Sequence, residues 1–232
     1  MENKNSKIEH FSRQLLNEII PYIKNISPIQ LGINNSYFIN VFSNINKIYL
    51  DLSFNKDESN DFMTHPVSTA GRILHGLNKS YLIKIIIYLS KNAEKNINIY
   101  LSKIYFDTLA IIRHELEHLS QHDSFIISNA YISDNFDYNS KQFPLHIKAY
   151  YLQQSEKTAF ISGIYLKSKK LRQSFYQVLQ ISLINEIEKA LYIHYSKYLE
   201  KEQASQLATQ ESGEINNILL EEAKKRYPKL II

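Results

Sequence analysis

Residues 114–118 read His-Glu-Leu-Glu-His and carry the side chains best suited to metal chemistry in this chain. They fit the pattern H-E-x-x-H and fall within residues 104–122, a stretch that we expect to be helical. Residues four apart lie one above the other on the same face of a helix, so His114 and His118 are predicted to bind one zinc ion. Glu115 is then the predicted general base, which takes a proton from a water activated by the zinc.

The residues around the motif support a helix with one buried side. Ile112, Leu116 and Leu119 follow helical spacing, which places the histidines on the neighbouring face. The alternative is a polar helix face with two ordinary histidines, because so short a motif needs its structural context. We interpret Glu117 as a surface carboxylate. Its alternative role is to orient one of the histidines without itself binding the metal.

A catalytic zinc site needs a third protein ligand and an open position for water. His122 continues the four-residue spacing, but it would lie about 12 Å from His114 along a straight helix, which is too far to share one ion. His146 and Glu156 are the other candidates. The longer pattern H-E-x-x-H-x-x-G-x-x-H is excluded, because its glycine and its last histidine are absent.

The surroundings of Glu156 carry a second pattern. Tyr150 and Tyr151 are followed by a short spacer and then by Glu156 and Ala159, at the expected start of a second helix. With the first motif, this pattern resembles the gluzincin-like zinc metallopeptidases, in particular small zincin-like proteins of bacteria and phages. Thr158 stands where many of these proteins have a second acid, and their proline before the glutamate is missing here.

The resemblance covers about residues 80–165 and implies a ligand set. A glutamate on the second helix completes the site in that family, so His114, His118 and Glu156 are the implied zinc ligands. The alternative for Glu156 is a solvated carboxylate, which the helix dipole favours near a helix N-terminus.

The fold implied by the resemblance is α+β and zincin-like. A small mixed or antiparallel sheet would pack on the motif helix and on the second ligand helix, with a helical extension at the C-terminus. Residues 81–90 form the strongest predicted strand, because one of its faces is entirely apolar. By the resemblance, this strand would lie beside the motif helix and pair with an extended substrate.

One compact domain with a helical C-terminal extension is expected. Residues 1–200 would form the zincin-like metallopeptidase domain, and residues 201–232 a flexible link and a short C-terminal helix. Residues 123–145 are expected to be a loop that either covers the cleft or is a passive surface segment.

The remaining expected elements are helices and strands. The expected helices are an amphipathic helix over 7–24 that Pro21 ends or kinks, a short helix over 67–77, and helices over 147–168 and 170–200. Strands are expected over 37–42 and 47–54.

Composition restricts the classes of function. The chain has 232 residues, no cysteine and a formal net charge of +4, so zinc–thiolate sites and cysteine nucleophiles are excluded. The lysines are scattered, which argues against nucleic acid as a partner. We find no apolar run typical of a signal peptide or a membrane span and expect a cytoplasmic protein without membrane binding; association with a virion is compatible with the phage resemblance.

These observations predict a zinc metallopeptidase whose partner is a peptide or protein substrate. The alternative is a catalytically inactive zincin-like protein that acts through protein contacts, with the metal only pinning two helices together. A third interpretation is a helical interaction protein whose motif is accidental. The three differ in zinc content and in access of water to the metal, because structural zinc sites are closed by a fourth protein ligand.

Overall fold

The computed structural model describes residues 4–33, 47–56, 67–75, 80–121 and 140–230. Contacts divide the chain into two compact units, Met1–Gln121 and His122–Ile232, a division that differs from the expected boundary at residue 200. The elements of the first unit are α1 (Lys4–Lys24), β1 (Ile29–Ile33), β2 (Lys47–Lys56), β3 (Val67–His75), β4 (Ser80–Leu89), α2 (Lys91–Lys95) and α3 (Ile97–Ser120). Those of the second unit are α5 (Phe143–Leu152), α6 (Gln154–Leu171), α7 (Phe175–Leu179), the π-helical turn η2 (Gln180–Ile184), α8 (Asn185–Tyr195) and α9 (Lys201–Arg226).

The first unit contains a four-stranded mixed sheet with the strand order β1-β2-β4-β3. β1 pairs antiparallel with β2, β2 pairs parallel with β4, and β4 pairs antiparallel with β3. The expectation of an α+β protein with a small mixed sheet is therefore confirmed. The finer assignment to a zincin-like fold stays a prediction.

β4 forms where alternation in the sequence predicts the strongest strand. Ile83, Ile85 and Ile87 are fully buried on one face, and the intervening residues are only partly covered. Because β4 lies between β2 and β3, its backbone groups are paired on both sides. The expected role of residues 81–90 as a substrate-binding edge strand is therefore wrong.

β3 replaces the short helix expected over residues 67–77. Its residues pair one by one with β4, and Val67, Thr69 and Ile73 lie opposite buried residues of that strand. Branched side chains at alternate positions suit a pleated, half-buried strand better than a helix. Pairing with β4, rather than local preference, decides the conformation of this segment, and it places β3 at one end of the described sheet.

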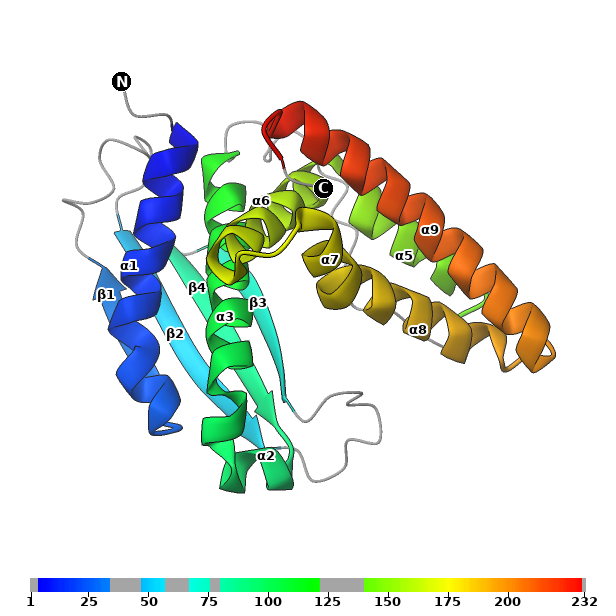
Figure 1. The fold of residues 1–232 in the computed structure, drawn as a ribbon. Coiled ribbons are helices and arrows are strands. Elements are labelled where there is room, and N and C mark those ends of the chain that lie inside the picture. Colours follow the sequence, from blue (N-terminus) through cyan, green and yellow to red (C-terminus); the bar gives the residue numbers. More distant parts are fainter. Residues whose placement is uncertain (1–3, 34–46, 57–66, 76–79, 122–139, 231–232) are drawn as a thin grey trace. The chain divides into compact units, whose positions relative to one another are not determined.

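α1 and α3 pack against each other and lie over one face of the sheet (Figure 1). α1 buries Ile8, Leu15, Ile19 and Ile23, as its helical periodicity predicts. Pro21 does not end this helix, which continues to Lys24. α3 contacts both β3 and β4, so the helix that carries the motif rests directly on the sheet.

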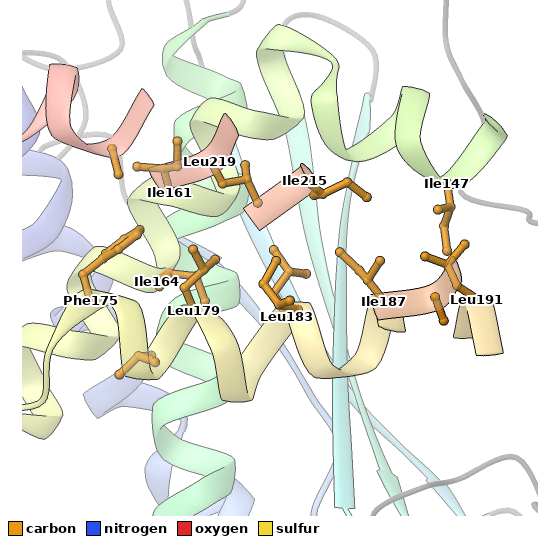
Figure 2. Packing of buried hydrophobic residues seen from close by; sticks show 14 of the residues in the cluster. Ile147, Ile161, Ile164, Phe175, Leu179, Leu183, Ile187, Leu191, Ile215 and Leu219 are labelled. Atoms are coloured by element: carbon orange, nitrogen blue, oxygen red, sulfur yellow. The ribbon is translucent and has the colours of Figure 1, made fainter. Parts of the chain in front are cut away.

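The second unit is helical and has its own apolar core. Leu179, Leu183, Ile187 and Leu191, which recur every four residues, are all buried there. Figure 2 shows these side chains from α7, η2 and α8 pointing toward residues of α5, α6 and α9. These four residues form an apolar stripe that is part of the core, and Tyr195, which continues the four-residue spacing, is partly buried against it.

Two expectations for the second unit need correction. The helix expected over residues 147–168 is two helices, α5 and α6, because the backbone of Gln153 is extended, with φ −56° and ψ 132°. Residues 203–213 are not a flexible link, since they lie inside the continuous helix α9. Ala204 and Ala208 are buried there, so α9 is held by packing along its length.

Some expectations concern residues beyond the described ranges. The predicted strand over 37–42 and most of the predicted loop over 123–145 lie outside the described residues. Within the described part of the chain, none of the helices combines the length and the apolar character that a membrane crossing requires.

Candidate metal centre

The two motif histidines lie on α3 and face each other. The Nε2 atoms of His114 and His118 are 3.0 Å apart, and the ring centroids are 4.7 Å apart. The rings meet edge to face, with an angle of 78° between their planes. The predicted i, i+4 geometry is therefore present, and it brings two nitrogen donors to one place.

Glu115 and His118 are buried, although both are polar. Glu115 is 4% exposed and His118 is 8% exposed, whereas His114 is partly exposed. Buried carboxylates and imidazoles are costly for a fold unless they are bound by other polar groups or by a metal. The motif therefore does not lie on an open helix surface.

Glu117 is buried as well, which corrects its interpretation as a surface carboxylate. It is 3% exposed and accepts a hydrogen bond of 2.6 Å from Nη1 of Arg113, which is fully buried. Arg113 and Glu117 each precede one of the two motif histidines by one position along α3. The pair therefore occupies a helix face next to that of the imidazoles and fixes the rotamer of each partner.

Glu156 lies in the first turn of α6, where a second ligand helix is expected. It is partly buried, and the neighbouring Thr158 and Ala159 are buried. His114, His118 and Glu156 form a group that could hold a metal ion: each offers one ligand atom, and these atoms lie within 4.8 Å of one another.

Of the other two candidates for the third ligand, only His146 lies among the described residues, and it does not join this group. His146 is exposed on α5. His122 lies outside the residues that the structure describes. Among the described residues, Glu156 is the candidate third ligand that belongs to this group, and its role as a metal ligand stays a prediction.

The donor types and the histidine spacing fit a divalent cation. Two ligand atoms that each lie about 2.0–2.1 Å from an ion must be within about 4 Å of each other, and the imidazole nitrogens meet this condition at 3.0 Å. Two imidazoles and one carboxylate also form a donor set found in catalytic zinc sites. The geometry fits a metal ion without fixing which metal it is.

Gly71 is a neighbour of the motif that the sequence did not reveal. It lies on β3, and a Cβ atom added there would be 2.2 Å from Cγ2 of Ile111 and 3.1 Å from Oε1 of Glu115. β3 therefore runs close against α3 at the motif. The only signal in the sequence is a glycine within a segment of alternating branched residues, which indicates a close approach of the backbone to another element.

These assignments rest on the chain's own residues and their geometry. α3 and β3 position Glu115, His114 and His118, and α6 carries Glu156. Comparisons with family models, with curated proteins and with solved structures gave no match.

Proposed function

We propose that this chain is a zinc-dependent metallopeptidase of the gluzincin-like type, which hydrolyses peptide bonds. The observation that carries the proposal is the convergence of the His114 and His118 Nε2 atoms on the helix that also carries the buried Glu115. A metal held by imidazoles next to a carboxylate base is the arrangement needed to hydrolyse an amide at neutral pH.

His114, His118 and Glu156 would hold the ion, each through one atom. The mixed nitrogen and oxygen donor set favours zinc over magnesium or calcium, which prefer oxygen ligands throughout. When bound, zinc would supply Lewis acidity toward a water and toward the carbonyl oxygen of the substrate. The absence of cysteine removes thiolate ligands from consideration.

Glu115 is the proposed general base. It follows His114 on α3, so the backbone that fixes the histidine also fixes the carboxylate. Its carboxylate accepts a proton from the attacking water and then donates that proton to the leaving amine nitrogen. Burial by β3 restricts the carboxylate to few rotamers, which preserves its position between the two proton transfers.

The proposed substrate is an extended segment of a peptide or protein. β3 stands at the end of the described sheet next to α3, and an edge strand offers amide and carbonyl groups to an extended chain. We therefore propose that β3 pairs with the substrate. β4 cannot do so, because it already pairs with a strand on each side. Nucleic acid and membrane are not among the partners that we propose.

Elemental analysis of zinc per chain is the first test, on protein purified without added metal. Wild type is expected to contain one zinc, and His118→Ala and Glu156→Ala are expected to lose it. His146→Ala is the matched control and should keep the metal, because His146 is exposed and outside the ligand group. Retention of zinc by Glu156→Ala with loss in His122→Ala would move the third ligand to His122.

Hydrolysis of fluorescein-labelled casein and of a mixed library of quenched peptides is the second test. Glu115→Gln should keep zinc and lose about 10²- to 10⁴-fold in rate, the usual contribution of a general base. Cleavage by this variant at the wild-type rate would refute the mechanism. Stoichiometric zinc in a wild type that cleaves nothing would favour the alternative function, a structural or regulatory protein in which the metal pins two helices.

A further inference from the structure

We propose that Gly71 is a positioning residue for Glu115: by lacking a side chain, it lets β3 approach α3 closely enough to fix the carboxylate of the general base. The inference rests on the proposed function, because it concerns the residue that would move the proton. It adds a residue on the strand to a site otherwise built from helices.

The register of the sheet shows where a side chain at position 71 would point. Gly71 lies directly opposite Ile85 of β4, and residues opposite each other in an antiparallel pair project to the same face. Ile85 is fully buried on the face that β4 turns toward the helices, and α3 contacts β3 more closely than it contacts β4. A side chain at position 71 would therefore project into α3.

The space between the two elements is already filled. Ile111 and Glu115 are one helical turn apart on α3, and a methyl group on residue 71 would lie 2.2 Å from Cγ2 of Ile111. It would also lie 3.1 Å from Oε1 and 3.5 Å from Cγ of Glu115. The first separation is impossible without movement, since carbon atoms in contact lie about 3.5–4.0 Å apart. The glycine is thus required by the approach of the two backbones.

The neighbouring positions on this face of β3 are at least partly buried. Thr69, two residues before Gly71 on the same face of β3, has a buried hydroxyl, as has Thr108 on α3. Neither hydroxyl has a hydrogen-bond partner among the described residues. Ile73, two residues after Gly71, lies opposite buried Ile83. An added methyl group must therefore displace Ile111, Glu115 or the strand itself.

Displacement of Glu115 would affect the chemistry more than the metal. His114 and His118 are not among the nearest atoms of position 71, whereas Oε1 and Cγ of Glu115 are. Errors of about 1 Å in the position of a catalytic group can reduce a rate by about 10²-fold. The expected signature is a fall in kcat with zinc content preserved, rather than loss of the ion.

Four variants test the proposal: Gly71→Ala, Ile111→Ala, the double variant, and Gly32→Ala as control. Among the described residues, a Cβ at Gly32 on β1 would meet the Tyr49 side chain alone, at 3.8 Å, so this change adds a methyl group to a strand at an ordinary contact distance. Each is measured for zinc per chain, for kcat and KM on quenched peptides, and for the position of Glu115 by crystallography.

Gly71→Ala is expected to keep one zinc and to lose about tenfold or more in kcat, with KM within about twofold of wild type. Ile111→Ala should restore part of the loss, because it removes Cγ2 and makes room for the new methyl group. The double variant and Ile111→Ala alone differ by one methyl group beside Glu115, and the double variant should remain about threefold slower. Gly32→Ala should match wild type.

Equal kcat in the double variant and in Ile111→Ala, with Glu115 in the same place in both crystal structures, would overturn the proposal. If Gly71→Ala alone does not fold, the comparison of the double variant with Ile111→Ala still tests the positioning role. If the wild type hydrolyses nothing, the proposed function fails separately, and the crystal structures still decide. A carboxylate displaced in the double variant supports the positioning role, and an unmoved carboxylate refutes it.

Discussion

α3 in the first unit and the α7–α8 segment in the second both bury apolar side chains, but α3 also buries an Arg–Glu pair and two polar residues of the motif. α3 covers Arg113, Glu115, Glu117 and His118 at exposures of 8% or less. The α7–α8 segment covers an uninterrupted apolar stripe that ends at Leu191.

The two segments differ in whether the stability of the fold explains the residues that they bury. Burial of leucine and isoleucine stabilises a fold by about 1.5–3 kcal/mol for each side chain. This stabilisation is enough to explain why the α7–α8 segment has an apolar stripe. Burial of an ion pair often gives no net stabilisation, because desolvation offsets the attraction between the charges. The buried polar residues of α3 are therefore a feature that stability does not explain, and the proposed function would account for them.

The largest expected effect on stability comes from breaking the buried pair on α3. Arg113→Met should lower the free energy of unfolding by about 3–5 kcal/mol, because it leaves the Glu117 carboxylate buried without its cation. Urea denaturation of the metal-free protein, followed by circular dichroism, measures the change.

The matched variant removes both charges. Arg113→Met with Glu117→Leu should recover most of the lost stability, since Nε and Nη2 of Arg113 have no hydrogen-bond partner in the described part of the chain. A double variant as unstable as Arg113→Met would show that the pair stabilises the fold, and the contrast with the second unit would then disappear.

A cavity in the apolar stripe should have the next largest effect. Leu191→Ala removes a fully buried side chain and should cost about 2–5 kcal/mol, from lost transfer energy and the cavity that remains. Ile181→Ala on η2 is the control: this side chain is 64% exposed, and the change should stay within about 0.5 kcal/mol. Equal losses in the two variants would mean that the stripe is not the source of stability in this unit.

A smaller effect of opposite sign is expected on α9. Gly213 lies inside this helix, and a Cβ atom there would meet no atom of the described residues within 4 Å. Gly213→Ala should therefore stabilise the protein by about 0.5–1 kcal/mol, by reducing the backbone freedom of the unfolded chain. Thermal unfolding measures the shift, and a lower midpoint temperature would contradict the continuous helix that replaces the expected flexible link.

The last effect appears only in alkaline solution. Burial and the hydrogen bond to Glu211 raise the pKa of Tyr195 above its ordinary value of 10.0. Above that pH the unfolded chain loses the phenolic proton while the folded protein keeps it, so the stabilisation from this group falls as pH rises toward the folded-state pKa. Unfolding from pH 8 to 11 should show a steeper loss of stability in wild type than in Tyr195→Phe, and parallel curves would refute the assignment.

Patterns of neighbouring residues predicted much of this architecture. The spacing of His114 and His118 gave their convergence, alternation along residues 81–90 gave β4, and the four-residue stripe gave the core of the second unit. Each is a periodicity that the helix or strand itself imposes on its side chains. Glu156 required a resemblance in addition, because nothing around it in sequence distinguishes a ligand from a solvated carboxylate.

Contacts between distant segments decided the rest. The branched and small residues of β3 permit either a helix or a strand, and hydrogen bonding to β4 selects the strand. The same pairing places β4 inside the described sheet and β3 at its end, which is why we propose β3 and not β4 as the strand that pairs with substrate. Glu117 has an ordinary position on a helix, and it is buried only because α3 packs among other elements.

By itself the sequence determined the chemistry that the chain can offer: two imidazoles and a carboxylate at fixed spacing on one helix, and no thiol. The tertiary structure decided what surrounds that chemistry, including the buried Arg113–Glu117 pair and the contact of Gly71 with Glu115. The physical reason is one of range. Helical spacing is set by hydrogen bonds between residues four apart, whereas burial and close approach depend on elements that meet only after the chain has folded.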